Sequence, residues 1–306
     1  MPDNEMMSRT KTFIIALSLL LPLSAVAKPH LVTTIKPLGL IASDIAGNYA
    51  EVDILLPDRA SPHDYALKPS DIKRLNEADA VFWVGPEVEL FLEKVIAGKN
   101  HSVQLTAYPG MPVRYFDESI HGHDDHSHHG HSHEGIDGHI WLGPNQSVVI
   151  AKAVKDTLIK LDPTNADVYE ENFADFSAGV ENTKNTLLRQ FSAIDNKGYF
   201  LFHDAYGYFE DAFNLNPLGH LTINPERKPG AKTLISIRSV IKKGQAQCVF
   251  SEPQFNPAMV SNLVKGTDTK ILVLDPLATD FAVGKNHYVD FLNSLGRQYL
   301  SCFMPI

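Results

Sequence analysis

Cysteine is scarce in this chain of 306 residues, which contains only Cys248 and Cys302. Neither lies near the N-terminus, so we expect no lipid anchor on a lipobox cysteine. A structural zinc site needs four cysteine or histidine ligands. Two cysteines cannot form such a site alone, which leaves a disulfide, or a metal site completed by other residues, as the alternatives.

Positive charge is also in short supply, because 27 Lys and Arg stand against 36 Asp and Glu, for a formal net charge of -9. An acidic surface repels nucleic acid and anionic lipid, whereas it attracts small cations. Histidine, in contrast, is abundant at 14 residues. The composition therefore argues against a nucleic-acid partner and indicates cation binding.

The N-terminus has the pattern of an export signal. Arg9 and Lys11 precede an apolar run, Phe13 to Leu23, which ends in Ala25-Val26-Ala27 before Lys28. A basic start, an apolar core and an A-x-A site are typical of a cleaved signal peptide, here residues 1–27. A membrane anchor is the alternative, but the run is too short to span a bilayer. We expect a soluble protein of a Gram-negative periplasm.

An exported protein meets an oxidising compartment, where paired cysteines usually form disulfides. Cys248 lies in an apolar, strand-like run and Cys302 lies near the C-terminus. A bond between them would close a loop of roughly 55 residues and stabilise the second half by about 3 to 4 kcal/mol. We predict this disulfide in preference to a metal site at the cysteines.

Apolar, β-branched runs alternate with helical patterns along the chain, as in parallel sheets with helices on both faces. The predicted strands are Leu31–Ile35, Val52–Leu56, Ala80–Val84, Tyr199–Phe202, Leu221–Ile223, Gln247–Phe250 and Lys270–Leu274. The predicted helices run from an N-cap at Ser70 through Leu75, from Pro86 through Val95, and from Thr233 to Lys243 before Gly244. The sequence thus predicts an α/β fold of two similar lobes, each a mostly parallel sheet flanked by helices.

A long polar stretch separates the two halves. From Pro163 to Phe191 the apolar residues recur every three to four positions, and proline suits the first turn of a helix. We predict one long, rigid linker helix there. The expected organisation is a signal peptide (1–27), an N-terminal lobe (28–160) with a disordered His-rich loop at 118–137, the linker helix (161–192) and a C-terminal lobe (193–306).

Half of the histidines lie in one short segment. They are His121, His123, His126, His128, His129, His131 and His133, interleaved with Gly, Asp and Ser. Because such a segment cannot form a core, we expect an exposed, disordered loop whose imidazoles and carboxylates bind divalent ions loosely and interchangeably. A solvated loop without a role is the alternative.

Three other histidines occupy positions suited to a ligand site, since parallel sheets bind ligands at the carboxyl ends of their strands. His63 follows the strand Val52–Leu56, His203 ends another strand, and His139 follows the His-rich segment. Asp275 closes a further strand of the second lobe. Three imidazoles and an oxygen suit tetrahedral zinc, whereas all-oxygen octahedral sites suit magnesium, calcium or manganese. Zinc is the predicted ion, although histidines so far apart in sequence are in themselves a weak signal.

Several short stretches around these residues form a recognisable set. They are SPHDYALKPSD at 61–71, ADAVFWVG at 78–85, HIWL at 139–142, FHDAYGY at 202–208, EPQF at 252–255 and LDPL at 274–277. With them the chain resembles the metal-binding solute-binding proteins of ABC transporters, specifically their ZnuA-like zinc-uptake branch. The resemblance covers essentially the whole chain after the signal peptide. It implies a metal buried between two lobes, a helix that limits lobe motion, and delivery of Zn²⁺ to an inner-membrane permease with its cytoplasmic ATPase.

The resemblance implies His63, His139 and His203 as the metal ligands. Manganese-type relatives carry a carboxylate where His203 stands, so a histidine there indicates zinc. Some zinc members have Glu immediately before the first histidine, and here that position is Pro62. The fourth ligand is then water or Asp275, which aligns with an acidic ligand in other branches.

Two further features agree with the zinc-uptake branch. Its members carry a His- and Asp-rich insertion, which the resemblance implies gathers or senses zinc rather than forming the tight site. A disulfide like the one between Cys248 and Cys302 occurs in part of the branch. A monomer is expected, and an auxiliary periplasmic zinc chaperone is considered as a further partner.

The expected mechanism is capture by neutral imidazoles, so affinity should fall as pH drops toward the usual histidine pKa of about 6.5. Release is expected from lobe displacement when the protein docks on the permease. An enzyme is not expected, because the sequence has no H-E-x-x-H or comparable motif, and Asp204 is interpreted as orienting a ligand or capping a helix. Manganese or iron uptake, a stand-alone periplasmic zinc buffer and a surface adhesin stay open as alternatives.

Overall fold

The computed structural model describes residues 27–96, 98–116, 135–194, 198–284 and 287–304. Nearly all of the predicted signal peptide and all seven histidines of the segment 121–133 lie outside these residues. Residues 135–137, which we predicted as part of a disordered loop, instead belong to the described structure, and Ile136 pairs with Tyr115 in an isolated antiparallel bridge.

The first lobe is built on a four-stranded parallel sheet. Its strands are β1 (His30–Thr33), β2 (Glu51–Ile54), β3 (Ala80–Trp83) and β4 (Ser102–Gln104), in the order β2-β1-β3-β4. The connecting helices are α1 (Lys36–Ala46), α2 (Pro69–Glu77) and α3 (Leu90–Ile96). Every residue of β3 is buried, as expected for a central strand covered on both faces.

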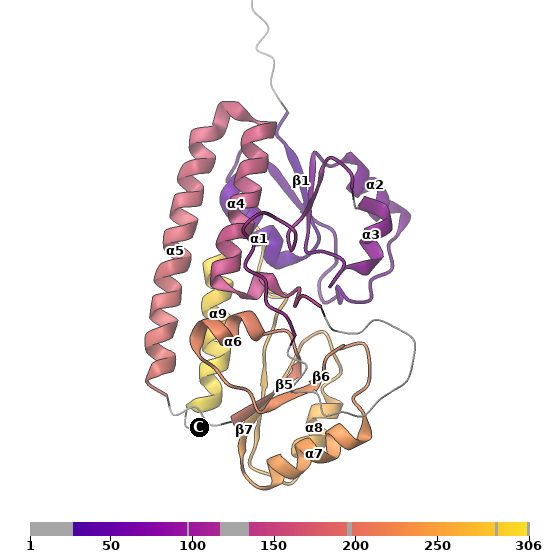
Figure 1. The fold of residues 1–306 in the computed structure, drawn as a ribbon, viewed down its shortest axis with the longest axis vertical. Helices are drawn as coiled ribbons and strands as arrows, with labels where there is room; N and C mark the ends of the chain where they lie inside the picture. The colour runs from indigo at the N-terminus through magenta and orange to yellow at the C-terminus, as the bar shows by residue number, and fades with distance from the viewer. Residues whose placement is uncertain (1–26, 97, 117–134, 195–197, 285–286, 305–306) are drawn as a thin grey trace, which may run out of the picture.

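The second lobe repeats this plan. Its strands are β5 (Gly198–His203), β6 (Gly219–Thr222), β7 (Ala246–Ser251) and β8 (Lys270–Val273), in the order β6-β5-β7-β8, all parallel. Its helices are α6 (Gly207–Phe213), α7 (Ala231–Lys242) and α8 (Ala258–Val264). Figure 1 shows the two sheets one above the other. The predicted fold of two similar parallel-sheet lobes is confirmed.

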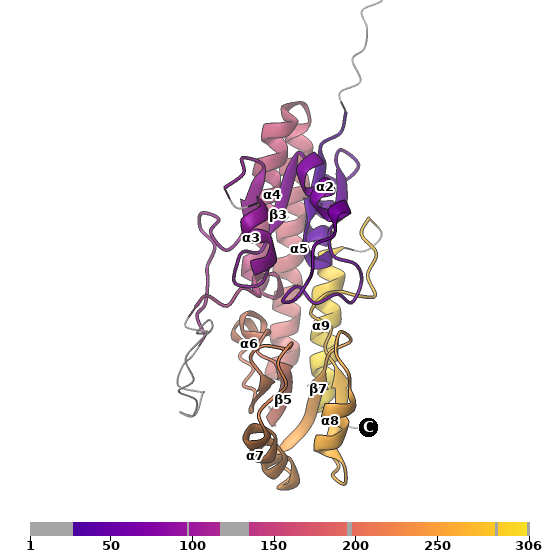
Figure 2. The ribbon, with the colours of Figure 1, turned by 90° about the vertical axis from the view of Figure 1, so that its right-hand side faces the viewer.

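Long helices run alongside both lobes. They are α4 (Pro144–Leu161), which follows the short helix η2 (Ile140–Leu142), then α5 (Ala166–Ser192) and α9 (Tyr288–Phe303). Helix α9 contacts α5, α1 of the first lobe, and β7 and β8 of the second (Figure 2). The predicted linker helix is therefore not the sole connection between the lobes among the described helices. Among the described helices, none is both long and apolar enough to span a lipid bilayer.

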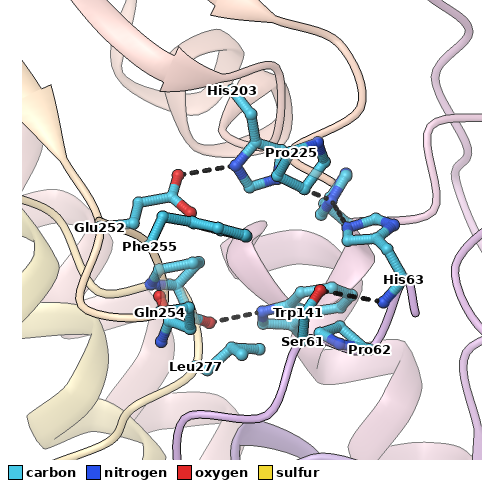
Figure 3. Close-up of a pocket in the computed structure, with 12 residues that line it drawn as sticks. Ser61, Pro62, His63, Trp141, His203, Pro225, Glu252, Gln254, Phe255 and Leu277 are labelled. Carbon is cyan, nitrogen blue, oxygen red and sulfur yellow. Dashed lines mark hydrogen bonds and ion pairs between the residues drawn. The ribbon is translucent and has the colours of Figure 1, made fainter. Parts of the chain in front are cut away.

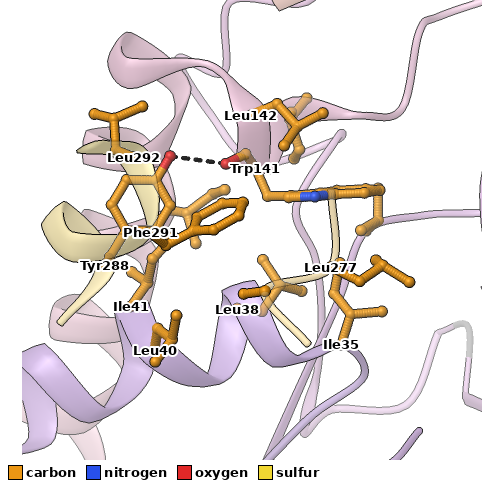
Figure 4. Close-up of a cluster of buried hydrophobic side chains, with 14 of the residues drawn as sticks. Ile35, Leu38, Leu40, Ile41, Trp141, Leu142, Leu277, Tyr288, Phe291 and Leu292 are labelled. Atoms are coloured by element: carbon orange, nitrogen blue, oxygen red, sulfur yellow. Dashed lines mark hydrogen bonds between the residues drawn. The ribbon is translucent and has the colours of Figure 1, made fainter. Parts of the chain in front are cut away.

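The core continues from one lobe into the other at the place where α1 and α9 meet. Trp141 of η2 packs among apolar residues from both lobes, and Tyr288 of α9 donates a hydrogen bond from Oη to the Trp141 carbonyl at 2.7 Å (Figure 4). Leu38 of α1 and Leu277, which follows β8, belong to the same cluster. This shared core fixes the residues next to His139 against both lobes.

Helix α7 begins at Ala231, two residues before the predicted Thr233. Three other helix starts differ from the predictions for local reasons. The N-cap of α2 is Lys68, whose N–H donates to Asp71 Oδ2 at 2.9 Å, so Ser70 lies inside the helix. Helix α3 begins only at Leu90, because Glu89 Oε2 accepts from the Val84 N–H at 2.7 Å and holds the preceding residues in a turn. Pro163 belongs to a separate 3₁₀ turn, η3 (Pro163–Asn165), and not to α5.

Two other predictions are confirmed. Cys248 of β7 and Cys302 of α9 form a disulfide across 54 residues of sequence. Gly244, predicted just past the end of α7, has φ of 68°, a left-handed conformation that glycine adopts without steric cost. Strand β4 and helices α4 and α9 were not predicted.

A buried carboxyl group in the second lobe makes stability depend on pH. Glu210 of α6 is 6% exposed and accepts a hydrogen bond from Tyr199 Oη at 2.7 Å. Burial raises the pKa of Glu210 from 4.5 to about 8. Because the folded-state pKa lies above the unfolded one, the stability that Glu210 contributes is complete below the unfolded value and is lost as pH rises through the folded value.

We therefore expect the urea midpoint of the wild-type protein to fall between about pH 5 and 9. The variant Glu210→Gln stays neutral and keeps an oxygen acceptor for Tyr199, so it should remove this part of the decrease. Urea unfolding of both proteins across the pH range measures the difference. Identical pH dependence in the two proteins would contradict a raised pKa at Glu210.

Candidate metal centre

The structure brings His63, His139 and His203 together between the two lobes. His63 lies in the loop after β2, His139 directly precedes η2, and His203 is the last residue of β5. One nitrogen from each ring lies within 4.8 Å of the others. His139 Nε2 lies 3.3 Å from His63 Nε2 and 3.4 Å from His203 Nε2. The three predicted histidines thus form one cluster although they are far apart in sequence.

Hydrogen bonds on the far side of two rings determine where their protons reside. His139 Nδ1 lies 2.8 Å from Asp137 Oδ1, and His203 Nδ1 lies 2.7 Å from Glu252 Oε1. A carboxylate accepts and cannot donate, so in each neutral imidazole the proton stays on Nδ1 and the lone pair is on Nε2. The Nε2 atoms of His139 and His203 therefore face each other as two acceptors, an arrangement that a cation between them stabilises.

The spacing of these nitrogens suits a tetrahedral ion. Zinc binds histidine nitrogen at about 2.0–2.1 Å, so two nitrogens on one tetrahedral zinc ion stand about 3.3 Å apart. The observed separations of 3.3 and 3.4 Å agree with this value. Carboxylates behind ligating histidines are also usual in zinc sites, because they fix the tautomer and the ring orientation.

The two supporting carboxylates have different surroundings. Asp137 is fully buried, and its second oxygen, Oδ2, accepts from Arg114 Nη1 at 2.9 Å. Burial acts to raise its pKa, but the hydrogen bonds from His139 and Arg114 outweigh that effect, and the pKa of Asp137 is lowered. Glu252 is 4% exposed, and Oε1 accepts from His203 and from Tyr206 Oη, while Oε2 has no hydrogen-bond partner among the described residues.

Residues of both lobes line a pocket at the cluster (Figure 3). The lining residues are Ser61, Pro62, His63, His139, Trp141, His203, Pro225, Glu252, Gln254, Phe255, Pro276 and Leu277. The Trp141 indole N–H donates to the Pro276 carbonyl at 2.8 Å and so joins the His139 segment to the loop after β8. A direct hydrogen bond thus connects the two lobes at the pocket.

Other predicted residues lie outside this cluster. Asp275 is buried, but its oxygens accept from the Leu277 and Thr279 N–H groups and from Gln254 Nε2, and it is not part of the metal-binding group. The remaining described histidines have separate contacts: His101 with the Leu75 carbonyl and His287 with Asp44, for example. Asp204 lies 3.8 Å from His220 Nδ1.

Sequence reasoning missed the three residues that support the histidines. Asp137 stands two positions before His139, and Glu252 is the first residue of the EPQF stretch. Both could have been found by looking for acidic residues next to the predicted ligands and in the motifs. Arg114 gave no signal, because it is an ordinary arginine far from any predicted ligand. Only the fold brings it to Asp137.

Sequence comparisons place the chain among zinc-uptake proteins. A family model described as ZnuA, zinc-uptake complex component A, periplasmic, matches residues 31–302. The high-affinity zinc uptake system protein ZnuA of Yersinia pestis is 42% identical over 291 residues, which cover 90% of this chain and 92% of that protein. The protein of the same name from Haemophilus ducreyi is 41% identical, over 92% of this chain and 96% of its own length.

Solved structures share the fold at lower identity. A ZnuA deletion mutant with zinc bound is 23% identical with a TM-score of 0.76, over 92% of this chain and 100% of that chain. The laminin-binding protein Lmb of Streptococcus agalactiae, described as having adhesin and metal-transporting activity, is 20% identical with a TM-score of 0.76, over 90% and 100%. These likenesses establish the two-lobed fold, which an adhesin and a zinc-uptake protein can share.

Proposed function

Because the chain belongs to the ZnuA family of periplasmic zinc-uptake components, we propose that it captures Zn²⁺ between its lobes and delivers the ion to an ABC permease. Proteins of this family are transport binding proteins and not enzymes, and they work with a membrane permease and its ATPase. Zinc is here the cargo, so the site must both hold the ion and let it go.

The convergence of three Nε2 atoms carries the proposal. Asp137 and Glu252 hold the protons of His139 and His203 on Nδ1, so that the Nε2 lone pairs of both rings point toward the space beside His63. The distances from His139 Nε2 to the other two Nε2 atoms suit tetrahedral zinc. Manganese and magnesium prefer oxygen ligands in octahedral sites, which this all-nitrogen group does not offer. We infer that His63, His139 and His203 are the zinc ligands.

The fourth coordination position is proposed to be open to water. Pro62 supplies no donor beside His63, and the oxygens of Asp275 already accept hydrogen bonds from neighbouring groups of its own loop. Recruiting Asp275 would break those bonds. We therefore prefer water to Asp275 as the fourth ligand, with Asp275 holding the loop after β8 in shape.

Release follows from the distribution of ligands. His63 and His139 come from the segments of the first lobe and His203 from the second lobe. A displacement of one lobe relative to the other would withdraw His203 and leave a two-histidine site of lower affinity. A permease that binds the displaced arrangement more tightly would shift the population toward release.

The remaining features are assigned as follows. We propose that residues 1–27 are a cleaved signal peptide, that the lobes span 28–160 and 193–306 with a linker helix at 161–192, and that the protein acts as a monomer in the periplasm. The seven histidines at 121–133 are proposed as an accessory, weaker zinc-gathering segment. An auxiliary zinc chaperone would act upstream of the same cleft.

Calorimetric titration of the metal-free chain from Lys28 onward tests this proposal. We expect one tight Zn²⁺ site that persists when residues 121–133 are deleted and that excess Mn²⁺ does not displace. The deletion leaves the three cleft histidines unchanged, so it isolates the cleft from the segment. Loss of tight binding with the segment would instead favour a zinc buffer, and displacement by Mn²⁺ would favour manganese uptake.

A further inference from the structure

We propose that Arg114 is a positioning residue for the metal site: it holds His139 in its ligating orientation through Asp137, and it also contacts the second lobe. This inference rests on the proposed function, because it assigns a role at the same site. Arg114 lies in the first-lobe segment after β4, and its guanidinium reaches both the carboxylate behind His139 and helix α6.

The contacts toward the metal site form a continuous chain. Arg114 Nη1 donates to Asp137 Oδ2 at 2.9 Å, while Asp137 Oδ1 accepts from His139 Nδ1 at 2.8 Å and from the His139 N–H at 3.0 Å. The Asp137 N–H in turn donates to the Arg114 carbonyl at 2.9 Å. With both oxygens engaged, the carboxylate cannot rotate without breaking a hydrogen bond, so its acceptor for His139 stays fixed.

The contacts toward the second lobe involve α6, the helix that follows His203. Arg114 Nε lies 3.3 Å from Asp211 Oδ2, and the Arg114 N–H donates to Tyr208 Oη at 2.9 Å. Tyr208 Oη itself donates to the Asp137 carbonyl at 2.6 Å. Arg114 thus connects Asp137, which supports His139, to helix α6, which begins shortly after His203.

The first residue of α6 leaves space for this guanidinium. A methyl group added to Gly207 would overlap the Arg114 guanidinium, so any larger residue at position 207 would push the side chain away from its place. Because α6 moves with the second lobe, a lobe displacement would also withdraw Asp211 and Tyr208 from Arg114. Lobe separation would then loosen His139 as well as remove His203.

Substitution of Arg114 gives a direct test in the chain from Lys28 onward. We expect Arg114→Met to lower the cleft affinity for Zn²⁺ by about 10-fold, the lower end of the range for groups that support a ligand directly, because Arg114 acts through Asp137. Arg74→Met is the matched control, since Arg74 is similarly exposed (31% against 27%) and bonded to Asp53 in the first lobe. Its zinc affinity should equal that of the wild type.

A second variant distinguishes positioning from general stability. Gly207→Ala leaves Arg114 in the chain but occupies its space, so it should weaken zinc binding by itself. In the Arg114→Met background the guanidinium is absent and the added methyl group should have little further effect. The two substitutions should therefore be strongly non-additive for zinc affinity. Additive losses would mean that each acts on the fold alone, and would overturn the proposal.

A spectroscopic readout reports on His139 itself. Nitrogen-15 correlation spectra of the metal-free protein should show His139 as the Nδ1–H tautomer in the wild type and in the control Arg74→Met. In Arg114→Met we expect a mixture of tautomers. Wild-type affinity together with an unchanged tautomer in Arg114→Met would overturn the role of Arg114 while leaving the zinc function intact. Absence of tight zinc binding in the wild type would remove both proposals.

Discussion

Replacement of His203 by alanine is expected to lower zinc affinity at the cleft by more than about 100-fold, since groups that merely support a ligand already contribute 10- to 100-fold. His203 is 3% exposed and is the proposed ligand from the second sheet, so its loss would remove a nitrogen and the connection that the ion makes between the lobes. Competition titration with a zinc chelator of known affinity measures the loss.

The same variant should lose most of the thermal stabilisation that zinc gives. A ligand at 1,000 times its Kd stabilises a protein by about 4 kcal/mol, so a weakened site gives a much smaller shift at the same zinc concentration. His101→Ala is a suitable control, because His101 contacts the Leu75 carbonyl and lies outside the cluster. Equal zinc-induced shifts in wild type and His203→Ala would mean that the tight site lies elsewhere.

Much of the fold could be predicted because its signals are local. The buried strands β1, β3, β5 and β7 are short apolar runs, and α5 shows a helical period over its whole length. The starts of α2 and α3 could not be predicted, because they depend on which side chain reaches back to a free N–H group. Asp71 and Glu89 make those bonds in the folded chain, and their spacing alone did not reveal them.

The cluster of His63, His139 and His203 was predictable only in part. His63 and His203 follow strand ends, where parallel sheets gather ligands, and His139 was grouped with them because it follows the His-rich segment. The family resemblance implied the same three residues. The supporting network of Asp137, Glu252 and Arg114 was not predicted. Its members come from the loop before η2, the end of β7 and the segment after β4, and only tertiary packing places them behind the histidines.

The role of α9 was likewise beyond the sequence. A single linker helix was predicted between the lobes, yet α9 also contacts both. At its start Tyr288 bonds the Trp141 carbonyl beside the metal cluster, and at its end Cys302 is bonded to Cys248 of β7. The disulfide was predicted from the exported location of the chain, but the contacts of α9 with both lobes depend on where a C-terminal helix returns, which local periodicity does not encode.

Removal of the disulfide in Cys248→Ala/Cys302→Ala is expected to lower the free energy of unfolding by about 4 kcal/mol. The bond closes a loop of 54 residues, and in the chain-entropy model a loop of this length restricts the unfolded chain by about that amount. Both cysteines are fully buried in the folded protein, and alanine adds no polar group there. Urea denaturation of wild type and variant measures the difference, and a reductant should destabilise only the wild type.

Zinc affinity should change little in the same variant. Cys302 lies 14 residues after Tyr288 in α9, which corresponds to about 21 Å along a helix axis. The bonds that hold the histidine cluster, from Asp137, Glu252 and Trp141, involve neither cysteine. A stability loss without an affinity loss would place the disulfide in the second lobe's scaffold. If zinc affinity fell in parallel with stability, the disulfide would also affect the geometry of the histidine cluster through α9. The position of α9 would then be part of what determines zinc affinity.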